Sequence, residues 1–189
     1  MGHSQAEKAQ NRERILVEAA RQAREAGLES ISVGALMKSV GLTHGGFYGH
    51  FVSRTALLAE ALERALADGE ARAQNQSAGQ PRRFADMVRS YLSRTHRDTR
   101  DTGCAMAALV CDVGRAGEAS RHAMESHLEA FIASTAEALD GDEEKAMLAV
   151  SAMIGALALS RVLTDPARSD AFLRAVRVEL EGSCSPSPS

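Results

Sequence analysis

The chain has few residues that interrupt helices and no long apolar run. Four prolines occur among 189 residues, and they fall at expected helix boundaries or near the C-terminus (Pro81, Pro166, Pro186 and Pro188). Because proline breaks a helix interior, this distribution predicts an almost purely helical protein. No run of about 18 apolar residues exists, and the N-terminus lacks the apolar core of a signal peptide. We therefore expect no membrane span and a cytoplasmic protein.

Signatures of enzymes and metal sites are also lacking. The sequence has no candidate serine elbow and no glycine-rich phosphate loop after a strand. His122 and His127 are five residues apart, which turns them about 140° from one another on a helix, so they do not form a metal pair. We expect no catalytic residues, no cofactor and no metal ion.

Cysteine is scarce, with three in the chain. Cys104 and Cys111 are seven apart, about 10.5 Å on a helix, which exceeds the roughly 7 Å limit for a disulfide. Cys104 follows a polar stretch, so it is expected at a helix N-terminus near Arg97 and Arg100, a setting that favours a reactive thiol. Cys104 is our redox candidate. The alternative is that it has only a structural role, as a small buried residue. Cys111 is expected to be buried, and Cys184 to be exposed in the tail.

The most informative stretch runs from Ile31 to Phe51 and reads ISVGALMKSVGLTHGGFYGHF. Ser32 can cap a helix start, and apolar residues then recur at helical spacing, which predicts a short helix with one buried face. Gly41 can adopt the left-handed conformation that ends a helix and reverses the chain. Thr43 then caps a second helix. Two short helices around a glycine turn are typical of a DNA-reading helix-turn-helix.

The second of these helices is expected to meet DNA with its first residues. In helix-turn-helix proteins such residues face base edges in the major groove, and here they are Thr43, His44, Gly45 and Gly46. Each glycine costs about 1 kcal/mol relative to alanine in a helix interior. That loss is easier to understand if small residues let the backbone approach a surface closely.

The stretch GLTHGGFYGHF, followed by VSRTALLAEAL, resembles the signature of the TetR-type bacterial transcriptional regulators. The resemblance covers about the first sixty residues and depends on the glycine turn, the aromatic pair, His-Phe, a basic residue and a run of leucines. Two positions depart from it: Gly34 replaces a polar or charged residue, and Arg54 replaces the more usual lysine. The resemblance implies a homodimer that binds an operator in double-stranded DNA and responds to a small molecule.

Resemblance and position together assign roles within this segment. Thr43, Tyr48 and His50 should bind phosphates with Arg54, and His44 and Gly45 should face base edges, while Phe47 and Phe51 anchor the segment in its own core. The candidate DNA-binding residues are Ser32, Thr43, His44, Gly45, Gly46, Tyr48, His50 and Arg54.

Charge is unevenly distributed along the chain. The net charge is −3, yet residues 1–55 hold seven Lys or Arg against five acidic residues. A locally positive surface on an acidic protein suffices for phosphate contacts, and a dimer presents two such surfaces.

The expected fold is all-α. An N-terminal three-helix DNA-binding head with the helix-turn-helix (1–53) is joined by a long helix, about 54–76, to a larger ligand-binding and dimerisation domain (54–182). A disordered tail (183–189) follows, and an internal linker is expected at 75–81. The further helical segments are expected at about 82–97, 103–114, 117–139, 142–164 and 167–181.

The last two segments suit a dimer interface. The run AMLAVSAMIGALALSRVL has small residues on one side and large ones on the other, and with the last segment it predicts half of a four-helix bundle with a symmetry mate. An apolar effector pocket is a second expectation, although a methionine stripe is also typical of plain core. Its candidate residues are Met87, Tyr91, Met106, Met124, Phe131 and Met153.

These features predict a homodimeric transcriptional regulator, most simply a repressor that a small molecule or an electrophile releases from a palindromic operator. The alternative is a helical ligand-binding or scaffold protein whose head binds another protein. The salt dependence of binding distinguishes these two hypotheses, because binding to DNA phosphates weakens steeply as ionic strength rises.

Overall fold

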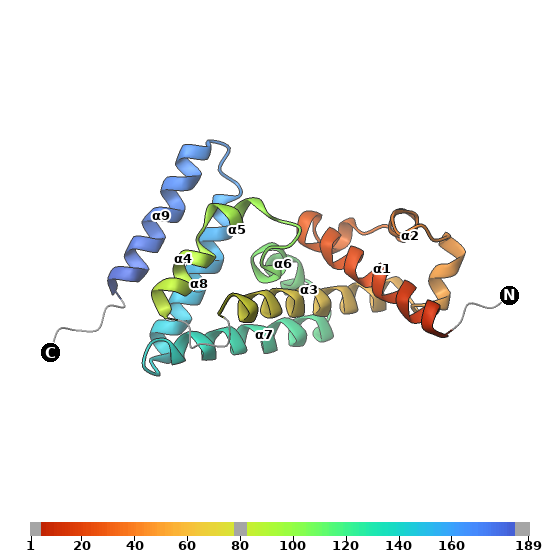
Figure 1. Ribbon diagram of the computed structural model, residues 1–189, viewed down its shortest axis with the longest axis horizontal. Coiled ribbons are helices and arrows are strands. Elements are labelled where there is room, and N and C mark those ends of the chain that lie inside the picture. The colour runs from red at the N-terminus through yellow and green to blue at the C-terminus, as the bar shows by residue number, and fades with distance from the viewer. Residues whose placement is uncertain (1–4, 78–82, 184–189) are drawn as a thin grey trace.

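A computed structural model of the chain describes residues 5–77 and 83–183, and every regular element in these ranges is helical. The molecule is elongated, with α1 and α2 at one end and α8 and α9 at the other (Figure 1). The elements are α1 (Gln5–Ala26), η1 (Leu28–Ser30), α2 (Val33–Ser39), η2 (His44–Gly49), α3 (Arg54–Ser77), α4 (Phe84–Tyr91), α5 (Arg94–Asp98), α6 (Ala105–Gly114), α7 (Glu118–Glu137), α8 (Glu143–Ser160) and α9 (Pro166–Ser183), where η marks a 3-10 helix.

A first apolar core surrounds the buried face of α1. Ile15, Ala19 and Ala23 recur at helical spacing and are fully buried, and they pack with residues of α2, η2 and α3. The same core continues into α6 and α7 through Leu109 and Met124. The head is therefore not packed in isolation, because its core is shared with the rest of the molecule.

The long helix α3 connects the two ends of the molecule, as the sequence predicts. Ser53 caps it, since the Ala56 backbone N–H donates to the Ser53 hydroxyl at 3.0 Å. Along its length α3 packs against α1, α6 and α7. Residues 78–82 of the expected linker, like residues 184–189 of the expected tail, lie outside the described residues.

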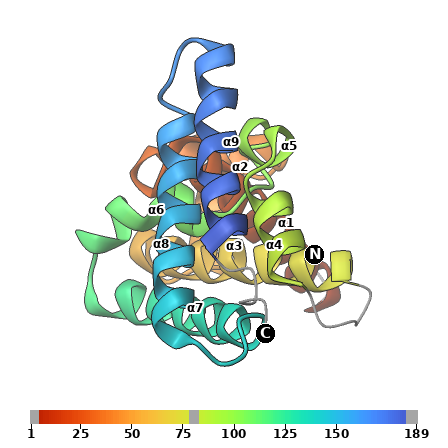
Figure 2. The same ribbon diagram turned by 90° about the vertical axis from the view of Figure 1, so that its left-hand side faces the viewer.

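A second apolar core joins α4, the C-terminal half of α7, α8 and α9. Val88, Val150 and Met153 are buried at its centre, and Leu173 joins it from α9. In Figure 2, α8 and α9 run side by side at the front of the molecule.

The sequence expectation of one helix over 82–97 is wrong. α4 ends at Tyr91 and α5 begins at Arg94. The reason is local: the Ser93 hydroxyl accepts a hydrogen bond from the His96 backbone N–H at 3.1 Å, so Ser93 starts a new helix. The other four segments are helical close to their expected bounds.

One outer face of α8 and α9 is apolar and exposed. Leu148 and Leu159 of α8 are 68% and 56% exposed, Val162 just after α8 is 75% exposed, and Val178 of α9 is 60% exposed. Leu148 and Leu159 are eleven residues apart, which places them on the same side of α8. This side is opposite the buried face that holds Val150 and Met153.

Candidate functional site

The turn between α2 and η2 follows the sequence prediction. Gly41 has a φ of +72°, the left-handed region that favours glycine. Its N–H donates to the Lys38 carbonyl at 3.0 Å, and the Leu42 N–H donates to the Met37 carbonyl at 2.8 Å. These two bonds end α2 and fix the direction in which η2 leaves it.

The second helix differs from the expected α-helix. His44–Gly49 is a 3-10 helix, with hydrogen bonds such as Gly46 N–H to the Thr43 carbonyl at 3.0 Å. Three glycines in six residues explain this, because they weaken the preference for a regular α-helix. Ser32 and Thr43 precede the two helices, but neither side chain makes the expected capping bond.

Adjacent aromatic residues of η2 lie in opposite environments. Phe47 is 1% exposed and stacks on Phe51, with ring centroids 5.7 Å apart, which confirms both as core anchors. Arg12 of α1 lies over the Phe51 ring at 4.8 Å. Tyr48 is 71% exposed, so its hydroxyl is available at the surface.

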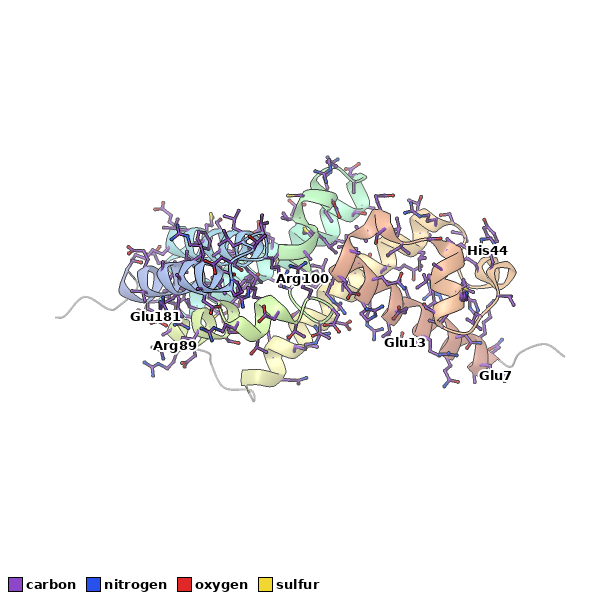
Figure 3. The ribbon with its side chains drawn as sticks, turned by 90° about the horizontal axis from the view of Figure 1, so that it is seen from above. Glu7, Glu13, His44, Arg89, Arg100 and Glu181 are labelled. Atoms are coloured by element: carbon purple, nitrogen blue, oxygen red, sulfur yellow. The ribbon has the colours of Figure 1, made fainter. Side chains whose placement is uncertain are left out.

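The candidate base-reading residues share one exposed surface. Thr43, His44, Gly45 and Gly46 are all exposed, as is Tyr48. Figure 3 places His44 at the end of the molecule that is remote from Arg89 and Glu181. Ser32 is exposed at the start of α2, and His50 is half-buried directly after η2.

The fold itself does not require two of the glycines in this surface. A Cβ atom built on Gly45 or on Gly49 meets nothing within 4 Å, and neither residue has a positive φ. Their cost in helix propensity is therefore not compensated by internal packing.

Most of the basic residues of the head have partners within the chain, which corrects the charge argument from sequence. Arg14 donates to the Val40 carbonyl at 2.6 Å, and Arg21 pairs with Glu18 and Glu25. Further pairs join Arg12 to Glu60 and Arg24 to Asp68. Lys8 and Lys38 are exposed and make no ion pair within the described part of the chain.

Arg54 also has internal partners. Its guanidinium donates to the carbonyls of Ile31 and Glu29 at 3.1 Å each and pairs with the Glu29 carboxylate at 3.0 Å. The start of α3 is thereby held against the segment before α2. This positioning contact was not expected from sequence, because its partners are backbone carbonyls.

The redox candidate Cys104 is the residue before α6, as expected, and it is part of a polar cluster. The Tyr91 hydroxyl donates to Cys104 Sγ at 3.0 Å, and the Cys104 N–H donates to His96 Nε2 at 3.0 Å. His96 Nδ1 donates in turn to the Tyr91 carbonyl at 2.8 Å. One ring nitrogen accepts and the other donates, so the contacts fit a neutral imidazole.

Burial controls the titration of this cluster. Desolvation raises the pKa of the Tyr91 hydroxyl well above its ordinary value, and the nearby Cys104 adds to that rise. Desolvation also lowers the pKa of His96; the bond to the Tyr91 carbonyl opposes this change, and the charge of Arg161 adds to it. Both side chains are therefore neutral near pH 7.

Cys111 is exposed on α6, so the expectation that it is buried is wrong. Sequence periodicity could not reveal this, because α6 is apolar on nearly every side. Cys184 lies outside the described residues.

The six candidate ligand residues do not converge on one site. Met106 and Met124 pack in or against the first core, whereas Tyr91, Phe131 and Met153 belong to the second. Tyr91 and Phe131 stack with ring centroids 5.6 Å apart. Met87 is buried as well. Their role in effector binding stays a prediction.

Two other expectations concern metals and membranes. The described residues contain no group of three metal-ligating side chains. Among them, no helix is both long enough and apolar enough to cross a membrane.

Comparison with known proteins shows what the chain is similar to. Residues 15–61 match the family model of the bacterial regulatory proteins, tetR family. Among curated proteins, none matches the chain. Several solved structures share the whole fold. The reduced form of Escherichia coli NemR is 20% identical, with a TM-score of 0.77 over 95% of this chain and 100% of that chain.

Two further relatives are similar over their full length. A TetR transcriptional regulator from Legionella pneumophila is 16% identical, with a TM-score of 0.75 over 98% of this chain and 100% of that one. A TetR-family regulator from Cytophaga hutchinsonii is 16% identical, with a TM-score of 0.73 over 95% and 98%. Residues 15–61 thus match the tetR-family model, and the chain shares its fold with these solved structures of TetR-family regulators.

Proposed function

We propose that the chain is a homodimeric repressor that binds a palindromic operator and is released from it by an effector. The head, residues 1–53, contacts DNA, and residues 54–182 dimerise and receive the effector. The exposed surface of η2 carries this proposal. It combines hydrogen-bonding side chains with glycines that the fold does not need.

The roles within this surface follow from exposure. His44 and Gly45 face base edges, and Thr43 and Tyr48 bind phosphates, because hydroxyl groups contact phosphate oxygens readily. His50 remains a candidate phosphate contact. Arg54 acts mainly by positioning, since its guanidinium already holds the segment before α2.

Recovery of bound fragments from a genomic DNA pool tests the proposal, followed by affinity measurements over a range of salt concentrations. We expect an imperfect palindrome as the bound sequence and an affinity that falls steeply with salt. A head that binds no duplex, or one whose binding does not depend on salt, would favour the alternative of a protein partner.

Two substitutions separate base reading from phosphate binding. Tyr48→Phe should weaken binding to every duplex alike. His44→Ala should also change the sequence preference, by roughly 1–3 kcal/mol at the base concerned. Equal and uniform losses for both variants would contradict this division of roles.

For the effector, we propose an electrophile that the Cys104 thiol attacks. The sulfur adds to the β-carbon of a quinone, an S–C bond forms, and the thiol proton ends on the quinone oxygen, so no further oxidant is needed. The adduct removes the contact with the Tyr91 hydroxyl and disturbs the packing around α6. Because α6 shares a core with α1 and α3, the change reaches the head.

Operator affinity measured with and without a quinone tests this step. Wild type should lose binding, and Cys104→Ser should keep it, since a serine oxygen can still accept from Tyr91. Cys111→Ser is a demanding control, because Cys111 is the more exposed thiol on the same helix. Equal sensitivity of wild type and Cys104→Ser would show that Cys104 is a structural residue.

A further inference from the structure

A small cavity lies between α9 and the junction of α4 with α5. Its volume is about 90 Å³, and its lining residues are Leu92, Arg94, Asp170, Leu173, Arg174 and Arg177. None of these residues belongs to the DNA-contacting surface or to the cluster around Cys104. The cavity is therefore separate from both of these sites.

Two of the arginines of this cavity lie on one face of α9, together with two acidic residues. Asp170, Arg174, Arg177 and Glu181 are spaced by four, three and four residues, so they share one face of the helix. The two acids at the ends of this row are paired across to other helices. Arg94 binds Asp170 at 2.6 Å, and Arg89 binds Glu181 at 2.8 Å.

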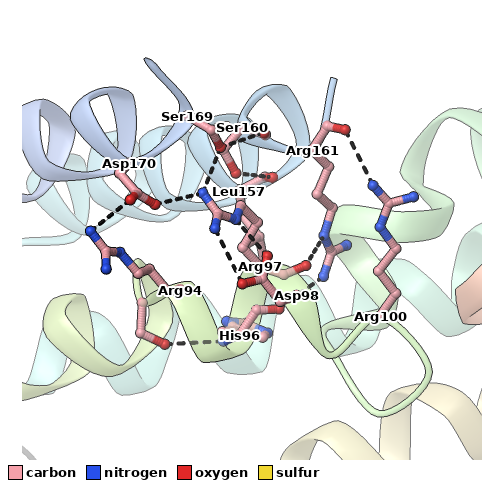
Figure 4. A network of polar contacts seen from close by, with 11 residues as sticks. Arg94, His96, Arg97, Asp98, Arg100, Leu157, Ser160, Arg161, Ser169 and Asp170 are labelled. Carbon is pink, nitrogen blue, oxygen red and sulfur yellow. Dashed lines mark hydrogen bonds and ion pairs between the residues drawn. The ribbon is translucent and has the colours of Figure 1, made fainter. Parts of the chain in front are cut away.

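The Asp170 carboxylate is bound by two arginines of α5. Besides Arg94, it accepts from Arg97 Nη1 at 2.8 Å, and Figure 4 shows it between these two side chains. Arg174 and Arg177 stand between the paired acids. Within the described part of the chain, neither makes a hydrogen bond or an ion pair.

The lining consequently has an excess of positive charge. Three arginines face one aspartate, a formal charge of +2 in a chain whose net charge is −3. Like charges held close together repel, and a guanidinium presents a planar fork of donors that matches the oxygens of a carboxylate or phosphate group. An anion in the cavity supplies the missing partner.

The volume limits the size of this anion. A buried water needs roughly 10–15 Å³ on the same measure, so the cavity of about 90 Å³ holds about six waters or one small ion. Pockets for drug-sized ligands measure roughly 300–1,000 Å³. Leu92 and Leu173 form the apolar part of the lining.

We propose that this cavity is a binding site for a small oxyanion, either inorganic phosphate or a short-chain carboxylate, which Arg174 and Arg177 hold with help from Arg94. The site belongs to the effector domain and is separate from the head, so it is expected to bind its ligand in the absence of DNA.

Calorimetric titration of the full chain with phosphate, and separately with butyrate, tests the proposal at constant ionic strength in a chloride buffer. We expect a dissociation constant in the millimolar range for at least one of them and a binding at least tenfold weaker in Arg177→Gln. Arg174→Gln, at an exposed position, is a second variant that should fold like wild type and show a weaker affinity.

Arg168→Gln is the matched control, because Arg168 is an exposed arginine of α9 that does not line the cavity. It should bind the anion like wild type. Phosphate binding alone would assign the site to phosphate, and butyrate binding alone to carboxylates. No heat with either anion, or equal binding in wild type, Arg177→Gln and Arg174→Gln, would overturn the proposal.

Discussion

At the scale of single residues, Gly45 is a position at which substitution can test DNA binding without disturbing the fold. No atom outside its immediate neighbours lies within 4 Å of a Cβ built there, and it sits beside the exposed His44. Gly41, in contrast, is required by its backbone conformation. The fold thus requires glycine at position 41 but not at position 45.

Gly45→Ala is expected to leave stability unchanged or slightly raised, because the added methyl meets no neighbour and alanine favours helices by up to about 1 kcal/mol. Operator affinity should fall at least tenfold, since the methyl separates the backbone from DNA. Fluorescence anisotropy and thermal unfolding measure the two effects. Gly69→Ala, also free of contacts but on α3, is the control that should bind like wild type. Unchanged affinity of Gly45→Ala would contradict close backbone approach.

His96 makes the stability depend on pH. Desolvation lowers the pKa of its folded form below the ordinary value of 6.5, so the unfolded chain takes up a proton first as the pH falls. The contribution of His96 is fully present above pH 6.5 and is lost as the pH falls from 6.5 toward the folded pKa. Urea unfolding at pH 7.5 and 5.5 should show a smaller pH effect in His96→Asn than in wild type.

The exposed His122 provides the comparison for this experiment. His122→Gln should keep the pH dependence of wild type. An identical dependence in wild type and His96→Asn would mean that His96 is protonated as easily in the folded chain as in the unfolded one.

At the scale of elements, the glycine turn decides how η2 is placed. Gly41→Ala should destabilise the protein by about 1–2 kcal/mol, because an L-residue pays this amount in the left-handed region and no neighbouring atom lies within 4 Å to add a clash. For a chain of this length the melting temperature falls by about 2–4 °C per kcal/mol.

Gly41→Asn should cost less than Gly41→Ala, since asparagine tolerates positive φ better. Differential scanning calorimetry of the three proteins gives the order directly. If alanine and asparagine cost the same, backbone strain is not the cause of the loss.

Sequence patterns predicted most helices and the glycine turn, because both depend on residues close in the chain. The break after Tyr91 was missed, since it depends on a single serine hydroxyl within a helical pattern. The same limit applies to the basic residues of the head. Arg14 donates to the Val40 carbonyl, a tertiary contact that cannot be predicted from the residue type alone.

The surface of η2 was predictable in its residues but not in its helix type. The candidate residues from Thr43 to Gly46 are exposed together, whereas the Tyr91–His96–Cys104 cluster could not be foreseen. Its members come from three elements, and two of its bonds use backbone atoms. The cavity beside Arg177 was missed for a similar reason, since it needs two helices that are distant in sequence.

At the scale of the whole molecule, the segment 96–102 links the effector domain to the head. Arg161, directly after α8, donates to the carbonyls of Arg97 at 3.2 Å and His96 at 3.1 Å (Figure 4). From the head, Arg24 donates to the Asp101 carbonyl at 2.5 Å. The segment thus connects the end of α8 and Cys104 to α1, through contacts at its two ends and the backbone between them.

Such a connection can change the spacing of two heads only in a dimer. We expect the second copy of the chain to pack on the exposed apolar face of α8 and α9. In a two-fold dimer each substitution occurs twice, so a charge placed in this face is buried twice without a partner and costs several kcal/mol. Leu159→Glu should therefore fold, because Leu159 is 56% exposed in the single chain, and yet sediment as a monomer.

The same variant should bind the operator at least a hundredfold more weakly than wild type, because one head contacts a single half-site. Val110→Glu, at an exposed apolar position of α6 rather than of α8 or α9, should stay dimeric and bind normally. Sedimentation equilibrium and operator titration on both variants give the two readouts. A dimeric Leu159→Glu would place the interface elsewhere, and a monomer with full affinity would mean that one head suffices for the operator.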